Sequence, residues 1–231
     1  MRNVYEIRLK IYLLQDIMVN QIQEKAAALI DKGFMSSTDL MKFHEENKYK
    51  GYVFGMFYPL EQDKCYKSGK IYTLTIRTVD PILAKYFSER CPNLYTKELK
   101  GLTAEIRILP KRMIQMLYTL TPVILKDEKG YWRTHKSLKD FEERLKANLI
   151  KKWNVFEGDK LDEDFPLYTS LEFLNQGPIV MEYKGIKLLG DKIRLQIADN
   201  KRAQDLAHFA LGVGVCEMNS RGCGFANYRW L

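Results

Sequence analysis

The sequence of 231 residues is poor in side chains that bind metals, and it has no apolar run that approaches transmembrane length. It has only three histidines, and its four cysteines form no C-x-x-C pair, so a zinc site has no credible ligand set. The opening residues lack the apolar core of a signal peptide, and no nucleotide or cofactor fingerprint is present. We therefore expect a cytoplasmic protein with reduced thiols, no metal, no cofactor and no membrane association.

Positive charge is in excess and is unevenly distributed. Lys and Arg number 37 against 29 Asp and Glu, which gives a net charge of +8. Residues 1–112 carry 19 basic and 13 acidic side chains, a net +6, and the remainder carries 18 and 16, a net +2. No basic run is longer than two or three residues, which excludes a ribosomal or chromatin-type tail. This balance favours nucleic acid or another anionic surface as the partner.

The segment near the C-terminus is rich in glycine and carries one arginine. It holds Gly212, Gly214, Gly222 and Gly224 around Asn219-Ser220-Arg221. Glycine permits a close backbone approach, and a loop of this kind can aim several N–H groups at an anion. The spacing matches neither G-x-x-x-x-G-K-[ST] nor G-x-G-x-x-G, so common nucleotide folds are disfavoured. A polyanion is the first ligand to consider, and a glycine-rich turn before a final strand is the alternative.

The order of predicted elements is β-α-β-β-α-β in each half of the chain. In the first half we predict strands at 4–13, 50–58, 70–79 and 102–109, a helix from 17 to 33, and a helix that begins at Pro81 with Asp80 as its N-cap. In the second half we predict a strand at 116–125, an amphipathic helix at 137–153, a hairpin of 179–188 with 192–198, a helix capped by Asp199, and a strand at 224–230. The sequence thus predicts an α+β fold of two tandem ferredoxin-like (RRM-like, βαββαβ) domains, residues 1–112 and 113–231.

These motifs together resemble one family over essentially the entire chain. The resemblance rests on Gly212-x-Gly214 before Asn219-Ser220-Arg221-Gly222-x-Gly224-Phe225, on Thr121-Pro122-Val123-Ile124-Leu125, and on Gly130-Tyr131-Trp132 before a basic helix. The chain resembles the CRISPR-associated endoribonucleases of the repeat-associated mysterious protein superfamily, which cut the precursor CRISPR transcript within its repeats. The resemblance implies metal-independent attack of a ribose 2′-OH on the adjacent phosphate, leaving 2′,3′-cyclic phosphate and 5′-OH ends.

Two other functions stay open at this point. Noncatalytic RNA-binding subunits of CRISPR effector complexes carry similar loops, and small-molecule enzymes share the fold. The first differs from a nuclease in leaving repeat RNA uncut, and the second in having no affinity for it.

The resemblance directs attention to the connection between the first helix and the second strand, where the family commonly keeps a catalytic histidine. His44 lies there among polar neighbours, and a solvated loop histidine is the alternative interpretation. Lys50 matches the position of a catalytic lysine, with Lys48 as its rival. The tyrosine that some members have on the preceding helix has no counterpart, so Tyr49 or Tyr52 substitutes for it or the enzyme uses histidine and lysine only.

The other histidines and nearby serines have weaker claims. His135 reads as a surface residue at a helix start, and His208 is the alternative catalytic histidine. Ser36 and Ser37 are candidate hydrogen-bond partners of the substrate, although ordinary loop serines are favoured.

Candidate RNA-binding residues lie in the second half of the chain. Besides the glycine motif they are the basic side chains of the predicted helix and of the following hairpin: Lys136, Lys139, Arg144, Lys146, Lys151, Lys152, Lys192 and Arg194. We expect no more than half of the helix positions to contact phosphate. CRISPR repeat RNA is the expected partner, and contacts with other effector subunits or a homodimer stay open. We expect the glycine-rich loop to position a substrate that is cut by His44 at the other side of a shared cleft.

Overall fold

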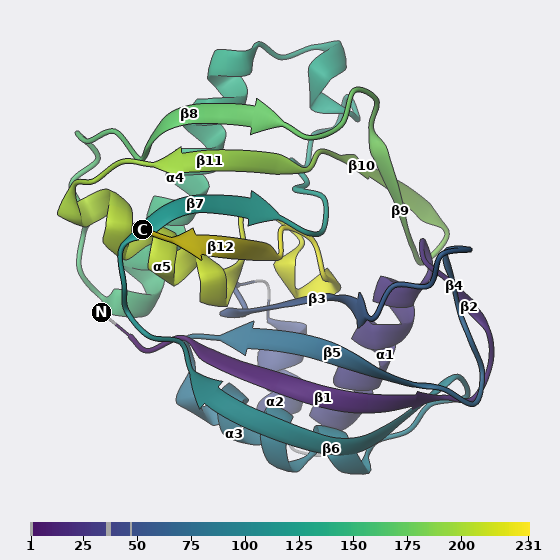
Figure 1. Ribbon diagram of the computed structural model, residues 1–231. Coiled ribbons are helices and arrows are strands. Elements are labelled where there is room, and N and C mark those ends of the chain that lie inside the picture. The colour runs from purple at the N-terminus through teal and green to yellow at the C-terminus, as the bar shows by residue number, and fades with distance from the viewer. Residues whose placement is uncertain (1, 36–37, 47) are drawn as a thin grey trace.

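The computed structural model describes residues 2–35, 38–46 and 48–231 and contains two four-stranded antiparallel sheets (Figure 1). The first sheet has the order β3-β5-β1-β6. Its strands are β1 (Tyr5–Leu13), β3 (Tyr52–Tyr58), β5 (Ile71–Thr78) and β6 (Leu99–Ile108). The second sheet has the order β12-β7-β11-β8. Its strands are β7 (Ile114–Thr119), β8 (Tyr168–Phe173), β11 (Ile193–Ile197) and β12 (Ala226–Trp230). Each order is that of a βαββαβ unit, so the predicted pair of ferredoxin-like folds is confirmed.

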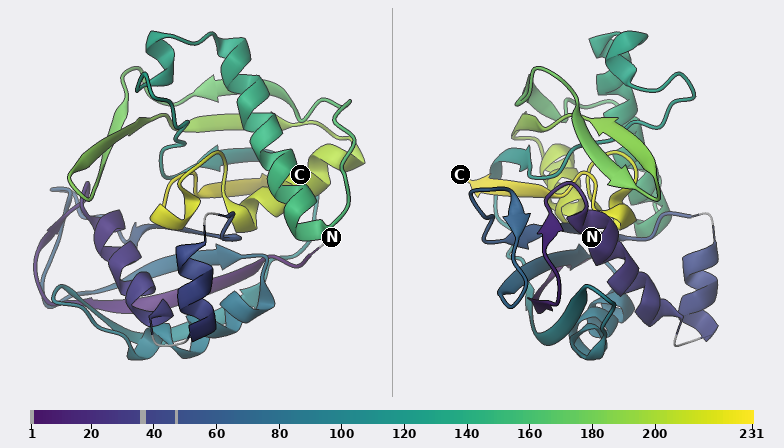
Figure 2. Two further views of the ribbon diagram at one scale, coloured as in Figure 1. Left: turned by 180° about the vertical axis from the view of Figure 1, so that it is seen from behind. Right: turned by 90° about the vertical axis from the view of Figure 1, so that its right-hand side faces the viewer.

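The helices cover one side of the two sheets and leave the other side open, as the view from behind shows (Figure 2). On the first sheet these are α1 (Ile22–Phe34) and α3 (Pro81–Glu89), and on the second α4 (Leu138–Glu157) and α5 (Lys201–Val213). Strand β1 shows how the sequence sets this arrangement, because Ile7, Leu9 and Ile11 are fully buried while Arg8 and Lys10 are exposed. The predicted boundary after residue 112 falls in the segment that joins β6 to β7.

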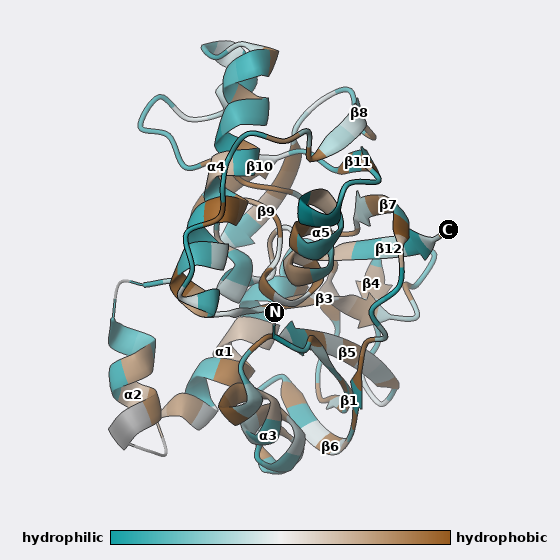
Figure 3. Ribbon diagram, turned by 90° about the vertical axis from the view of Figure 1, so that its left-hand side faces the viewer, coloured by the Kyte–Doolittle hydropathy of each residue, from teal (hydrophilic) through white to brown (hydrophobic). Residues whose placement is uncertain are grey.

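A further short helix, α2 (Thr38–Glu45), stands beside α1 at the edge of the body (Figure 3). The sequence prediction has a plain connection here, so the helix is an addition to it. His44 lies in the last turn of α2. His44 therefore lies on a helix and not in an irregular loop.

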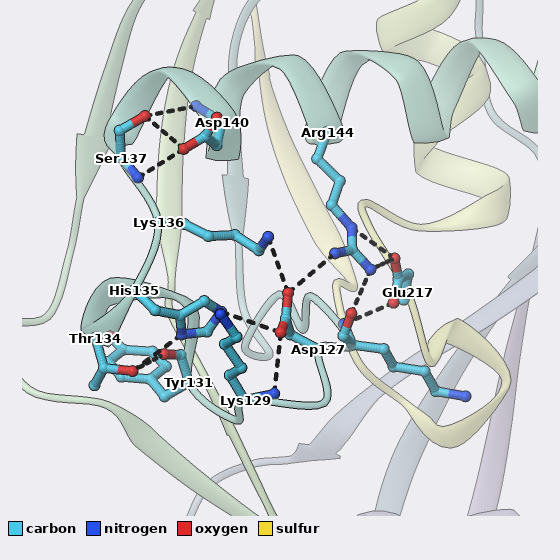
Figure 4. Close-up of polar contacts among 11 residues, drawn as sticks. Asp127, Lys129, Tyr131, Thr134, His135, Lys136, Ser137, Asp140, Arg144 and Glu217 are labelled. Carbon is cyan, nitrogen blue, oxygen red and sulfur yellow. Dashed lines mark hydrogen bonds and ion pairs between the residues drawn. The ribbon is translucent and has the colours of Figure 1, made fainter.

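Capping residues place the helix starts. The Asp80 carboxylate accepts from the N–H groups of Ile82 and Leu83, with Pro81 in the first turn, as predicted. Ser137 and Asp140 form a capping box at the start of α4 (Figure 4). The predicted cap at Asp199 is wrong by one residue, because the Asn200 side chain accepts from the N–H of Ala203.

The predicted hairpin of 179–188 with 192–198 is wrong. Strands β9 (Ile179–Tyr183) and β10 (Ile186–Gly190) pair with each other, and β11 pairs instead with β8. Lys184 and Gly185 have φ of 48° and 76°, which suits the two-residue turn of a tight hairpin. The first predicted helix also begins too early, since Ile17–Met18 forms a short strand, β2, paired with β4 (Cys65–Tyr66). In the described ranges no helix has the length and apolar character needed to cross a membrane.

Candidate functional site

The glycine-rich loop after α5 is held in a fixed shape by backbone conformations that favour glycine. Gly214, Gly222 and Gly224 have φ of 78°, 85° and 65°. A Cβ on Gly224 would lie 2.0 Å from the Val215 carbonyl oxygen. Gly212 is different, because it lies inside α5, and a Cβ there would lie 2.7 Å from Val79 Cγ1. Gly212 therefore lets a helix approach the first sheet, and its assignment to an RNA-binding loop is corrected.

The loop directs much of its backbone inward. The N–H groups of Arg221, Gly222, Cys223, Gly224 and Phe225 all donate to oxygens of the protein, at 2.8–3.2 Å. These five amides cannot form the phosphate cradle that the glycine spacing suggests. Internal hydrogen bonds therefore hold the backbone of the loop, and the Arg221 side chain is the group that the loop presents to neighbouring elements.

Lys152 of α4 lies at the centre of this loop. Its ammonium donates to Gly214 O (3.0 Å), Cys216 O (2.5 Å) and Asn219 Oδ1 (2.6 Å). The Asn219 amide in turn donates to Val215 O and Cys223 O, each at 3.0 Å. Lys152 is 2% exposed, so it is corrected from a candidate phosphate contact to an internal support of the loop.

The protonation of Lys152 links loop stability to pH. Burial lowers the pKa of Lys152 to about 7 from 10.5, although Cys216 and Glu217 act in the opposite direction. Below pH 7 both folded and unfolded chains hold this proton, whereas between pH 7 and 10.5 the unfolded chain binds more of it. We expect this group's contribution to the free energy of unfolding to rise with pH across that window. Denaturant unfolding at about pH 7 and about pH 9 tests this, because Lys152→Met will show a smaller rise than the wild type.

Arg221 reaches across to the first sheet's helices and meets an acidic residue of α1. Its Nη1 lies 2.6 Å from Asp31 Oδ2, and its guanidinium lies 5.2 Å from the Tyr183 ring centroid. The other carboxylate oxygen, Asp31 Oδ1, lies 3.4 Å from His44 Nδ1. The expectation that the glycine-rich loop and His44 lie on opposite sides of a cleft is therefore wrong, since Asp31 joins them.

Lys50 holds the backbone that carries His44. Its ammonium donates to the carbonyl oxygens of Phe43, of His44 (3.0 Å) and of Glu46 (2.7 Å), and it lies 4.8 Å from the Phe43 ring centroid. A cation at the C-terminal end of a helix satisfies carbonyls left free there. Burial lowers the pKa of Lys50, and nearby Lys48 and Arg221 act in the same direction while Glu46 and Asp31 oppose it. A direct catalytic role for Lys50 stays a prediction.

The remaining catalytic candidates differ in how far their side chains are exposed to solvent. Lys48 is exposed and pairs with Glu46. Tyr49 is half-buried, and burial raises the pKa of its phenol. Tyr52 is 1% exposed and packs against Phe34 and Phe87, so it lies in the core, where burial raises the pKa of its phenol. Of the two tyrosines, Tyr49 is the one nearer the surface.

Neither other histidine is placed beside His44. His208 is 3% exposed in α5, and burial lowers its pKa. His135 Nε2 lies 3.1 Å from Asp127 Oδ1 in the second half of the chain (Figure 4). Ser36 and Ser37 lie outside the described residues.

A cleft of about 1100 Å³ lies on the open side of the molecule, between the two sheets. Its walls come from β1, β3, β5 and β6 of the first sheet and from β9 and β12 in the second half. Two acidic side chains, Glu6 and Glu105, face six basic ones: Arg8, Lys10, Lys64, Arg77, Arg107 and Lys192. Glu6 is itself neutralised by Arg77 at 2.9 Å and Arg107 at 2.7 Å. The cleft is therefore cationic.

A family model for the C-terminal part of the CRISPR-associated protein Cas6 matches residues 105–228. The chain belongs to the Cas6 family. This match spans β7, β8, β11, the first residues of β12 and the whole glycine-rich loop, and it confirms the resemblance inferred from the sequence motifs. No curated protein sequence matches the chain.

Solved structures share the fold of this Cas6 chain over nearly its full length. One is described as an RAMP protein binding different RNA substrates, with a TM-score of 0.70 at 17% identity, covering 97% of this chain and 99% of its own. A Cas6-related protein of Pyrococcus furiosus has a TM-score of 0.67 at 17% identity, covering 98% of each chain. Thermus thermophilus Cas6 has a TM-score of 0.60 at 14% identity, covering 99% of each chain. At these identities the likeness shows the fold alone.

Two basic residues near the start of α4 in this Cas6 chain, Lys136 just before the helix and Arg144 within it, are engaged within the protein (Figure 4). Lys136 lies 3.0 Å from Asp127 Oδ2, and Arg144 lies 2.7 Å from Glu217 of the glycine-rich loop. Lys136 is the main cause of a strongly lowered pKa of Asp127. These contacts join the start of α4 to two loops and leave little cationic character for a ligand.

The other predicted RNA contacts are spread over the second half. Lys146 donates to Glu163 O (2.7 Å) and Phe165 O (2.5 Å). Arg194 of β11 pairs with Glu172 at 2.7 Å. Lys139 has an 85% exposed side chain with only a 3.8 Å contact to Glu143, so it is the most available of them.

Sequence reasoning missed Asp31 and the cationic cleft, and it misjudged Lys152. The cleft has a signal in β1, where Glu6, Arg8 and Lys10 alternate with buried residues. Lys152 follows Leu145 and Leu149 at helical spacing, which places a lysine on the buried face of α4. Asp31 has no comparable local signal.

Proposed function

We propose that this member of the Cas6 family is an endoribonuclease that cuts CRISPR repeat RNA without a metal ion. The ribose 2′-OH at the cut attacks the adjacent phosphorus, and the bond to the 5′ oxygen of the next nucleotide breaks. The 2′ proton passes to a base, and the leaving oxygen gains a proton. The products then carry a 2′,3′-cyclic phosphate and a 5′-OH.

The observation that carries this proposal is the setting of His44. Its side chain is 29% exposed, its Nδ1 faces Asp31, and its backbone is anchored through Lys50. Nε2 is then the ring nitrogen available to a substrate. An imidazole can both accept and donate a proton, and a placed acid or base contributes about 10²–10⁴-fold to a rate.

A cation beside the reacting phosphate would stabilise the charge that develops in the transition state. Lys50 is the predicted cation and Lys48 is its rival. Lys48 has a 54% exposed side chain and a single carboxylate partner, whereas Lys50 already donates to three carbonyls. Kinetics can tell a transition-state cation from a lysine that only binds RNA, because loss of a transition-state cation lowers the cleavage rate more than the RNA affinity.

We propose that the cationic cleft binds a part of the same RNA remote from the cut. The cleft lies on the open side of the sheets. Helix α2, which carries His44, lies on the helical side (Figure 2). Gln23 links the cleft to the glycine-rich loop, because it lines the cleft and its amide donates to Gly222 O at 2.6 Å. The similar RAMP protein that binds different RNA substrates supports RNA as the ligand.

Lys10→Ala will weaken binding of repeat RNA and reduce its salt dependence. Lys10 lines the cleft, is exposed, and has its ammonium 2.8 Å from Thr73 Oγ1. Loss of one phosphate contact lowers the slope of log affinity against log salt by about 1. Filter binding at several salt concentrations measures this slope. Lys85→Ala, an exposed position of α3, is the control and will keep the wild-type slope; equal slopes for all three proteins would contradict the assignment of the cleft.

A repeat RNA with a single 2′-deoxynucleotide tests the proposed chemistry. Placed at the cut, this substitution removes the nucleophile, and we expect cleavage to stop while binding persists. The same substitution one nucleotide away serves as the control and leaves cleavage intact. Continued cutting of the 2′-deoxy substrate at the same bond would rule out attack by the 2′-OH.

A further inference from the structure

We infer that Asp31 is a positioning residue for His44, and that Arg221 of the glycine-rich loop holds Asp31 in place. This inference rests on the proposed function of His44. By this inference, a residue of the second half of the chain controls the tautomer and orientation of a histidine in the first half.

The two oxygens of Asp31 have separate tasks. Oδ2 forms the 2.6 Å ion pair with Arg221. Oδ1 is buried and has no hydrogen-bond partner within the ranges that the structure describes. A buried acceptor without a donor is costly, and His44 Nδ1, 3.4 Å away, is placed to supply one after a small ring movement.

A carboxylate beside Nδ1 has a defined effect on an imidazole. It accepts a hydrogen bond from Nδ1–H, so the neutral ring keeps its proton on Nδ1 and leaves the lone pair of Nε2 toward the substrate. It also stabilises the imidazolium that forms when Nε2 takes a proton. Asp31 would thus set both the tautomer and the orientation of His44 without touching the RNA.

Arg221 can act on Asp31 because its own position is fixed. The loop around it is fastened by Lys152 and Asn219, and its side chain is only 20% exposed between Asp31 and Tyr183. The pair joins residues 190 positions apart. A shift of Arg221 in the glycine-rich loop would therefore move the Asp31 carboxylate and, through it, affect His44.

Asp31→Asn separates positioning from RNA binding. The amide that this substitution introduces can donate to Nδ1 of His44, which favours the wrong tautomer. We expect single-turnover cleavage to fall by about 10–100-fold, as for other partners that orient a histidine, with RNA affinity unchanged. Asp31→Glu will recover part of the rate. Glu24→Gln, in the first turn of the same helix, is the matched control and will cleave at the wild-type rate.

The nitrogen chemical shifts of the histidine rings test the inference independently of cleavage. The chain has three histidines, so the His44 signals can be assigned by substitution of each in turn. At a pH where the ring is neutral, we expect the proton on Nδ1 in the wild type and on Nε2 in Asp31→Asn. The same tautomer in both proteins would overturn the role of Asp31, whereas a tautomer change without any wild-type cleavage would sustain it and reject only the proposed nuclease.

An Arg221→Ala variant tests the second link. If Arg221 acts through Asp31, the cleavage rate falls and the tautomer signal broadens or shifts, with little change in RNA affinity. If affinity falls while both the bound-state rate and the tautomer persist, Arg221 is an RNA contact only and the inferred link is wrong.

Discussion

Replacement of His44 by alanine will lower the single-turnover rate of repeat RNA cleavage by about 10²–10⁴-fold, the usual contribution of a placed general acid or base. The side chain is partly exposed at the end of α2, so its removal leaves the core intact. RNA affinity will stay near that of the wild type, because the cationic cleft does not include this residue. Saturating protein in a rapid-quench assay separates the two quantities.

His135→Ala is the matched control for this experiment. His135 is also partly exposed beside a carboxylate, Asp127, but it lies in the second half of the chain. We expect its loss to leave the cleavage rate unchanged. Full activity of His44→Ala would overturn the assignment, and loss of activity in His208→Ala with a folded protein would point to His208 instead.

Lys152→Met will lower the free energy of unfolding by about 3–5 kcal/mol. Methionine fills a similar volume but donates nothing, whereas the Lys152 side chain donates three hydrogen bonds to these oxygens when charged and two when neutral, so its loss costs about 1–3 kcal/mol for each oxygen left unsatisfied in a buried place. Urea denaturation followed by circular dichroism measures the change. Such a loss is a large fraction of the stability of an ordinary domain.

Lys151→Met provides the comparison for Lys152→Met. Lys151 is the adjacent residue of the same helix, and it is exposed. Its replacement will change stability by no more than about 0.5 kcal/mol, as is usual for surface positions. Equal effects of the two substitutions would show that Lys152 does not fasten the glycine-rich loop.

Much of the fold could be predicted from local sequence signals. Strand β1 alternates buried and exposed residues, and Asp80-Pro81 marks the start of α3 by the chemistry of a cap. The error in strand pairing lies in the second half, where β8 is a short strand with weak alternation and pairs across a loop. Such a strand can be identified only from its pairing with β11, and a local sequence pattern does not reveal that pairing.

The candidate site was only half predictable for a similar reason. His44 and Arg221 stand out as residue types whose chemistry suits phosphate. Asp31, which lies between them, is one acidic residue on an amphipathic helix, and only the packing of two halves of the chain brings it to Arg221. The need for glycine at position 212 of α5 likewise comes from close packing against Val79 in the other half.

Incubation of the wild-type protein with repeat RNA in excess EDTA tests the central claim most directly. The account predicts a single cut, with a 2′,3′-cyclic phosphate on the upstream product and a 5′-OH on the downstream product. RNA that is bound but intact under these conditions would contradict it and identify a noncatalytic RNA-binding member of the Cas6 family.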